Sequence, residues 1–260
     1  MSAVPQVVID IGVSDIRAGV NGDKKPTIII PYENEGVVVD GEIKNFPIFE
    51  KYIEQVYQQL KIETLNSSLL VSLSTLNSLQ NKIELCDLLF NKFKVGNLFI
   101  GNQSVMVSYA YGQMTSIIII TDTINNNLTI LPVFDGYAQL KHIIQLNYSN
   151  IQEELLNQRF NEFVENVTKG LNVDPSKKEY LSKHVVLEGN NHSFIQNIRS
   201  KISESQPFET IDNLSTEPNA SFIGGSILTS LQDFLPMRLS SSEYSSNPKE
   251  EILRKKFFLL

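Results

Sequence analysis

The stretch Ser221-Phe-Ile-Gly-Gly-Ser-Ile-Leu-Thr-Ser-Leu-Gln-Asp-Phe-Leu235 decides the fold that this sequence predicts. Its first apolar residues predict the end of a strand, Gly224 and Gly225 a tight turn, and the remainder an amphipathic helix. Glycines in such a turn let backbone approach a phosphate, and the free N–H groups at the start of a helix attract anions. Plain turn chemistry is the alternative, so the segment favours a nucleotide site only together with others.

The N-terminal segment is the first of these others. Residues 7–23 predict a buried strand, a turn at 12–14 and a second strand. A similar unit follows at 117–138, where Asp122 stands at the first turn as Asp10 does in the N-terminal unit. Two strand–turn–strand units, each with an aspartate at its turn, predict two halves that face one cleft.

The remaining segments predict alternating helices and strands. Apolar residues recur at helical spacing over 46–60, a strand follows at 69–73, and a second helix runs from about 79 to 93. A further apolar stripe at 151–167 predicts a helix that packs in the core, and the segments 203–218 and 240–248 predict a loop and a polar connector. This alternation indicates an α/β protein with mixed sheets.

Composition excludes several functions. The formal net charge is −7 and the pI is near 5.1, which argues against nonspecific nucleic-acid binding. The short basic run Arg254–Lys256 predicts a solvated helix face. The single cysteine, Cys86, cannot form an internal disulfide, which indicates a reducing compartment, and its neighbours predict a buried helix position.

We expect no metal site built on histidines and no membrane span. The three histidines are far apart in the sequence and lack cysteine partners at metal-ligand spacing; they are His142, His184 and His192. No segment approaches the roughly 18 apolar residues that a transmembrane helix needs, and residues 1–6 lack the features of a signal peptide.

With these elements in place, the sequence resembles the actin family from end to end. Four segments carry the resemblance: 101–112, 132–138, 173–189 and 221–258. The second of them, Pro-Val-Phe-Asp-Gly-Tyr-Ala, is similar to actin's Pro-Ile-Tyr-Glu-Gly-Tyr-Ala. The resemblance implies the two-lobed α/β fold shared by actin, Hsp70 and sugar kinases.

The resemblance also implies how the chain divides. We expect a first lobe at 1–137, a second lobe at 138–235, and a C-terminal segment at 236–260 that returns to the first lobe.

ATP or ADP with Mg²⁺ is the cofactor that the resemblance implies. The matching positions are Asp10, Gly12, Ser14, Arg17, Gln103, Asp122, Gly189, Gly224 and Gly225. Among them, Asp10 and Asp122 match the aspartates that hold Mg²⁺ through water, and Gln103 matches the glutamine that orients the attacking water. Arg17 replaces a phosphate-contacting lysine and keeps its charge.

Other positions depart from the family pattern. They are Val13 in place of a serine, Asn125 in place of an aspartate, Thr129 in place of a histidine and Asn190 in place of a glycine. In addition, Pro218 stands at or near the position where the family has a lysine that packs on adenine. Phosphoryl transfer depends on positioned donors, so their loss costs more rate than affinity. We therefore expect slow or absent hydrolysis, and any bound nucleotide would act as a structural ligand.

Both small lobes of actin's pointed end are nearly missing. Only nineteen residues lie between Pro26 and Phe46, so the loop that actin inserts into its neighbour has no room. Most of the second small lobe is also missing between Ala138 and Val173.

The opposite end keeps its apolar character. The positions that match actin's barbed-end hydrophobic cleft are Tyr109, Gly112, Ile227, Leu228, Leu231 and Met237. An exposed apolar cleft indicates a partner site, with plain helix packing as the alternative, above all for Leu231. Such a chain would receive one neighbour and offer little to the next, as a subunit does that caps a pointed end.

Within the family, the chain is most similar to the short pointed-end actin-related subunit of dynactin. This implies a cytoplasmic, cytoskeletal protein in dynein-driven, microtubule-based transport. Its partners would be an actin or actin-related filament subunit and other pointed-end proteins, without nucleic acid or membrane. The alternatives are a nuclear actin-related scaffold of a chromatin-remodelling complex and an active actin-like ATPase.

Overall fold

The chain folds into two compact units. The computed structural model describes residues 6–33, 36–65, 67–122, 127–147, 162, 175–189, 195–196, 198–200, 209–211 and 219–257. Unit 1 comprises Met1–Met106 and Ser221–Leu260, and unit 2 comprises Val107–Ala220. This division differs from the expected lobes because the central hairpin builds the sheet of unit 2, whereas the segment after Ser221 packs on the sheet of unit 1.

Unit 1 is built on a six-stranded mixed sheet with the order β13-β7-β6-β1-β2-β3. Its strands are β1 (Gln6–Ile11), β2 (Asp15–Val20), β3 (Ile28–Pro31), β6 (Ser68–Leu73), β7 (Asn97–Asn102) and β13 (Leu239–Ser240). The expected N-terminal hairpin is confirmed, since β1 pairs antiparallel with β2, and β6 runs parallel to β1. All residues of β6 are buried, as expected for a strand covered on both faces.

The two expected helices of unit 1 are confirmed. α1 (Phe46–Leu60) begins at Asn45, whose side chain accepts a hydrogen bond from the N–H of Ile48. α2 (Leu79–Asp87) is capped by Ser78 and continues into the π-helical turn η1 (Leu88–Lys92). Cys86 lies on the buried face of α2, as predicted.

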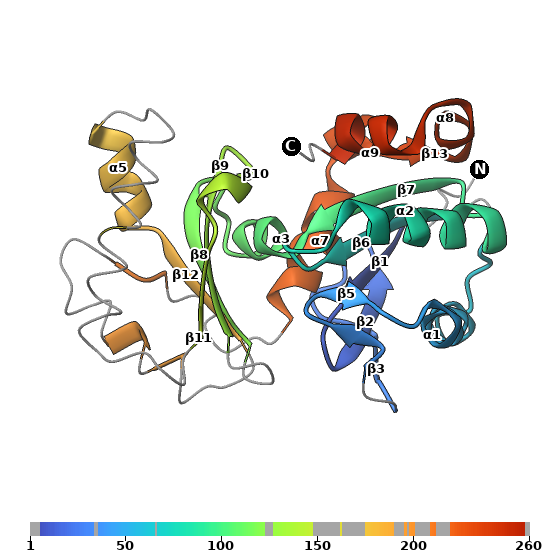
Figure 1. The fold of residues 1–260 in the computed structure, drawn as a ribbon, viewed down its shortest axis with the longest axis horizontal. Coiled ribbons are helices and arrows are strands. Elements are labelled where there is room, and N and C mark those ends of the chain that lie inside the picture. Colours follow the sequence, from blue (N-terminus) through green and yellow to red (C-terminus); the bar gives the residue numbers. More distant parts are fainter. Residues whose placement is uncertain are drawn as a thin grey trace. The chain divides into compact units, whose positions relative to one another are not determined.

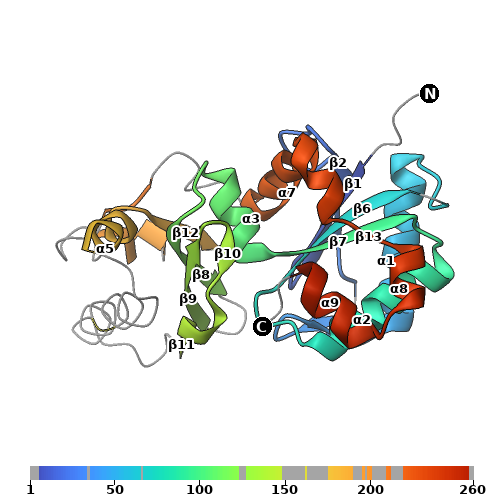
Figure 2. The ribbon, with the colours of Figure 1, turned by 90° about the horizontal axis from the view of Figure 1, so that it is seen from above.

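The predicted polar connector at 240–248 is wrong. This segment forms α8 (Ser241–Ser246), and α9 (Lys249–Phe257) follows it. A capping box explains α8: the hydroxyl of Ser240 accepts from the N–H of Glu243, whose carboxylate accepts from the N–H of Ser240. Both views show α8 and α9 beside β7 and β13 at one edge of the sheet (Figures 1 and 2).

The predicted strand and turn before residue 226 are also wrong. Ala220–Ser230 is one helix, α7, and a 3₁₀ segment, η4 (Gln232–Met237), follows. Both glycines therefore lie inside a helix, where they permit close packing. A Cβ on Gly224 would lie 1.7 Å from the carbonyl oxygen of Met106 in α3 (Gln103–Ala110). The two helices lie side by side in both views (Figures 1 and 2).

Unit 2 contains a mixed sheet with the order β10-β9-β8-β12, and β11 pairs with β9. Its described elements are β8 (Ser116–Asp122), β9 (Asn127–Phe134), β10 (Tyr137–Ala138), η2 (Leu140–His142), β11 (Ile144–Asn147), α5 (Pro175–Ser182) and β12 (Val185–Gly189). The expected hairpin of β8 and β9 is confirmed, and β12 runs parallel to β8. Nearly all of the predicted helix at 151–167 and of the predicted loop at 203–218 lies outside the described residues.

The substitution Gly224→Ala tests the contact between α7 and α3. The new methyl group would overlap the backbone of Met106, so we expect unfolding free energy to fall by about 3 kcal/mol, despite the better helix propensity of alanine. Urea denaturation followed by circular dichroism measures the change. Ser230→Ala, at an exposed position of the same helix, is the control and should change stability little. Equal stabilities of the two variants would contradict the packing role.

Candidate functional site

A buried carboxylate forms the centre of the candidate site in unit 1. Asp10, near the end of β1, is only 1% exposed. Its Oδ1 accepts hydrogen bonds from Gln103 Nε2 at 3.0 Å and from Ser221 Oγ at 2.8 Å. The hydroxyl of Ser221 also lies 2.6 Å from that of Ser72 in β6. The site therefore joins the sheet, the start of α3 and the start of α7.

Arg17 balances the charge of this carboxylate. Its Nη1 lies 3.6 Å from Asp10 Oδ2, and its Nε lies 2.9 Å from Asp15 Oδ1. A third nitrogen, Nη2, donates to Asp15 Oδ2 at 3.4 Å. Residues 15 and 17 are two apart on β2, so their side chains leave the same face of the strand. One guanidinium thus contacts two carboxylates.

The environment of Asp10 has opposing effects on its pKa. Burial is the largest effect and raises the pKa above the ordinary value of 3.8. The charge of Arg17 and the hydrogen bonds from Gln103 and Ser221 act in the opposite direction and stabilise the carboxylate. Burial prevails, so the folded protein holds the proton of Asp10 more tightly than the unfolded chain does.

The turn between β1 and β2 folds around Asp15. The N–H of Gly12 donates to the carbonyl of Asp15 at 2.9 Å, and the hydroxyl of Ser14 donates to Asp15 Oδ2 at 3.1 Å. The hydroxyl of Tyr32 donates to the carbonyl of Gly12 at 3.3 Å. The predicted residues Gly12 and Ser14 therefore lie in the same network as Asp10, through contacts within the hairpin.

Four of the predicted nucleotide-site residues lie in the network around Asp10: Gly12, Ser14, Arg17 and Gln103. Three predicted glycines have a packing role instead. Gly224 and Gly225 pack α7 against α3 and the sheet. In unit 2, a Cβ on Gly189 would lie 1.7 Å from Thr121 Oγ1, so this glycine allows β12 to end against β8. Asp122 ends β8, and its side chain lies outside the described part, as do Asn125, Asn190 and Pro218.

The predicted partner residues are divided between the units. In unit 1, Ile227 and Leu231 are 41% and 50% exposed, whereas Leu228 is buried and Met237 is half-buried. In unit 2, Gly112 is exposed just after α3, and Tyr109 is half-buried beside Gly136. The packing alternative holds for Leu228 but not for Leu231, which extends from the end of α7 into solvent.

Sequence reasoning missed Asp15, Ser72 and Ser221. Ser221 was part of the stretch that predicted a strand, and only its helical position brings the hydroxyl to Asp10. Asp15 could have been found from the spacing of an acid and a base on one strand face.

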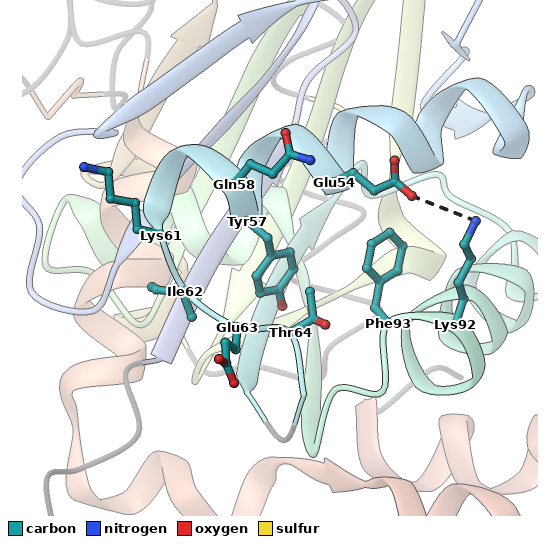
Figure 3. A pocket seen from close by; sticks show the side chains of 9 residues that line it. All are labelled: Glu54, Tyr57, Gln58, Lys61, Ile62, Glu63, Thr64, Lys92 and Phe93. Atoms are coloured by element: carbon teal, nitrogen blue, oxygen red, sulfur yellow. Dashed lines mark ion pairs between the residues drawn. The ribbon is translucent and has the colours of Figure 1, made fainter.

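A surface pocket lies elsewhere in unit 1, between the end of α1 and η1 (Figure 3). Its lining residues are Glu54, Tyr57, Gln58, Lys61, Ile62, Glu63, Thr64, Lys92 and Phe93. The rings of Tyr57 and Phe93 stack at 6.3 Å between centroids, and Lys92 forms an ion pair with Glu54. Burial raises the pKa of Tyr57 to about 12, so this phenol stays protonated near neutral pH. None of the predicted site residues lines this pocket.

The described residues contain neither a metal-binding cluster nor a membrane-spanning helix. In the described part of the chain, no cluster of three histidine, cysteine, aspartate or glutamate side chains could hold a metal ion. Among those same residues, no helix is both long enough and apolar enough to cross a bilayer. The ring of His184 stacks on Tyr180 with centroids 3.7 Å apart, which is a local packing contact.

Comparison with known proteins supports the resemblance seen in the sequence. Residues 32–215 match the family model described as Actin. Actin-related protein 4 of Arabidopsis thaliana is 29% identical over 108 residues, which cover 41% of this chain and 24% of that protein. Actin-related protein 2 of the same plant is 23% identical over 167 residues, covering 51% of this chain and 42% of that protein.

A third relative is actin-related protein 2 of Saccharomyces cerevisiae. It is 27% identical over 118 residues, which cover 45% of this chain and 28% of the yeast protein. These matches thus span less than half the length of each of the three relatives.

The stability of Asp10→Asn tests the raised pKa. A carboxyl whose folded-state pKa is raised stabilises the fold below the unfolded pKa, and this contribution is lost as pH rises through the folded-state pKa. The wild type should therefore lose stability relative to Asp10→Asn as pH rises above 3.8. Urea denaturation of both proteins at several pH values measures the difference. A stability difference between the wild type and Asp10→Asn that stays flat with pH would contradict the assignment.

Proposed function

Because this chain belongs to the actin family, we propose that it is a structural subunit that caps the pointed end of a short actin-related filament, as in dynactin. It would act in the cytoplasmic cytoskeleton and serve dynein-driven transport. The proposal has two parts: the chain lacks the segment that actin inserts into a neighbour, and it keeps an apolar surface that can receive one.

The segment between β3 and α1 carries the proposal, because its described residues are bound to unit 1 itself. It contains the two-residue strands β4 (Val38–Val39) and β5 (Glu42–Ile43), which pair as a small hairpin. The side chain of Asn81 in α2 accepts from the N–H of Ile43 at 3.1 Å and donates to its carbonyl at 2.8 Å. Asn77 donates to the carbonyl of Gly41 at 2.9 Å. The segment is thus bound to its own unit.

Buried side chains and an ion pair also stabilise the position of this hairpin in unit 1. Val38 and Ile43 are 5% and 2% exposed, so their side chains belong to the core. The carboxylate of Glu42 accepts from the N–H of Ser78 and pairs with Lys44, and these contacts lower its pKa to about 2. A segment with this many internal contacts cannot extend to a neighbouring subunit without losing them.

The receiving surface lies at the end of α7 and in η4. Leu228 and Phe234 are buried and anchor this region, whereas Ile227, Leu231 and Leu235 are 41%, 50% and 49% exposed. Three exposed large aliphatic side chains within nine residues are the composition expected of a contact surface.

The state of Gln103 supports a role without catalysis. Its Nε2 donates both to Asp10 and to the carbonyl of Ile11, at 3.0 and 2.9 Å. Both amide hydrogens are thereby used inside the protein, so of the polar atoms of this side chain only the amide oxygen is left to contact a water. A residue that orients an attacking water needs polar atoms that are available to the water. We therefore include slow or absent ATP hydrolysis in the proposal.

End-binding to filaments tests the function directly. The labelled chain, mixed with preformed actin-related filaments and viewed by electron microscopy, should decorate one end only, whereas incorporation along the filament would reject capping. Affinity purification from cells separates the alternative: dynein and dynactin subunits support the proposal, and a chromatin-remodelling ATPase would support the nuclear scaffold.

Leu231→Asp should weaken filament-end binding by about tenfold or more, because a charge would replace an exposed apolar contact. The matched control is Leu65→Asp, which places the same charge at a leucine that is 61% exposed in the loop before β6. Sedimentation or single-filament imaging measures the affinity. If both variants bind equally well, the end of α7 is not the receiving surface.

Phosphate release from Mg–ATP tests the absence of hydrolysis. We expect the wild type and Gln103→Ala to release phosphate at the same background rate, because the amide of Gln103 is held by Asp10 and Ile11. A coupled phosphate assay measures both rates. Turnover by the wild type that Gln103→Ala abolishes would instead establish the ATPase alternative.

A further inference from the structure

We propose that Asp15 takes the place of a nucleotide phosphate, so that unit 1 assembles its half of the family's nucleotide site without a nucleotide. The inference rests on contacts within unit 1 and is independent of the capping function. It explains why residues that match a phosphate site contact one another in this chain.

The guanidinium of Arg17 carries the argument. Arginine commonly binds phosphate through two nitrogens on one edge of the guanidinium. In this structure that edge faces Asp15, with Nε 2.9 Å from Oδ1 and Nη2 3.4 Å from Oδ2. The remaining nitrogen, Nη1, lies 3.6 Å from Asp10. The carboxylate of Asp15 thus occupies the edge formed by Nε and Nη2, and Asp10 lies beside the nitrogen that would complete the other edge.

A second donor of the turn also contacts the carboxylate of Asp15. The hydroxyl of Ser14 donates to Asp15 Oδ2, and the N–H of Gly12 is used in the turn itself, by the backbone carbonyl of Asp15. Hydroxyl and N–H groups are of the kind that binds phosphate in a glycine-containing turn. A phosphate at this turn would have to displace Asp15 from Arg17 and from Ser14.

Charge reinforces this competition. Asp10 and Asp15 together carry two negative charges and Arg17 one positive charge, so the ionised network has a net charge of −1. Asp10 is 1% exposed, and the side chains of Arg17 and Asp15 are 20% and 18% exposed, so solvent screens these charges only in part. A polyphosphate would add several more negative charges beside Asp15. The described residues of unit 1 therefore do not fit a bound nucleotide.

The network also supplies the cohesion that a ligand would otherwise provide. Asp10 connects β1 to α3 through Gln103 and to α7 through Ser221. Arg17 and Asp15 connect β1 to β2. A nucleotide that bound only the native state would stabilise the fold by mass action, and here protein groups provide these connections themselves.

Nucleotide binding by the purified full chain tests the inference. We expect the wild type to purify without a stoichiometric nucleotide and to show no binding of Mg–ATP or Mg–ADP by calorimetry tighter than about 1 mM. Its melting temperature should not change when Mg–ATP is added. Asp15→Asn, which removes the negative charge beside Arg17 and leaves a single, more weakly accepting amide oxygen there, should bind Mg–ATP at least about tenfold more tightly than the wild type.

Asp233→Asn is the matched control, because it removes the same charge from an exposed position of η4 and should leave Mg–ATP binding unchanged. A wild type that holds about one nucleotide per chain, or that Mg–ATP stabilises, would overturn the inference, as would an Asp15→Asn variant that folds but gains no affinity. If Asp15→Asn fails to fold, the wild-type measurements alone decide. Filament-end binding is measured separately, so either proposal can fail without the other.

Discussion

The buried carboxylate of Asp10 is the constraint on which the rest of unit 1 depends. Moving a carboxylate out of water is costly unless charge and hydrogen bonds compensate. Here the compensation comes from three segments far apart in the sequence, through Arg17, Gln103 and Ser221. Each of these segments must therefore reach the end of β1, and the packing of α3 and α7 follows from this requirement.

The position of Gly224 follows from the same constraint. Ser221 lies in the first turn of α7, and Gln103 begins α3, so both helices start close to the same carboxylate. At the distance these two helices have, a side chain at position 224 would overlap the backbone of α3. Gly224 avoids this overlap, with the carbonyl of Met106 directly opposite. Gly224 therefore serves the packing of α7 against α3, and it does not form a phosphate-binding turn.

The sequence predicted those features that depend on local pattern. The hairpin of β1 and β2, α1, α2 and the hairpin of β8 and β9 each have their own periodicity, and all are confirmed. The helix at 220–230 could not be predicted in this way, because two adjacent glycines disfavour a helix locally and only the contacts with α3 and with the sheet explain them. By contrast, α8 had a local signal in the capping box of Ser240 and Glu243, which the run of serines obscured.

The candidate site shows the same limit at the level of single side chains. Family positions identified Asp10, Arg17 and Gln103, and the structure places them in one network. They did not identify Asp15, because no family motif marks that position, although its contact with Arg17 determines what the guanidinium can bind. A ligand stabilises one state of a protein only if it binds that state better than the other. When Arg17 and the donors around it are already bound by Asp10 and Asp15, a phosphate gains little by binding the folded state. The hairpin bound to α2 and the network around Asp15 therefore have a common physical character, because each holds within the chain groups that the family directs toward a neighbour or a ligand.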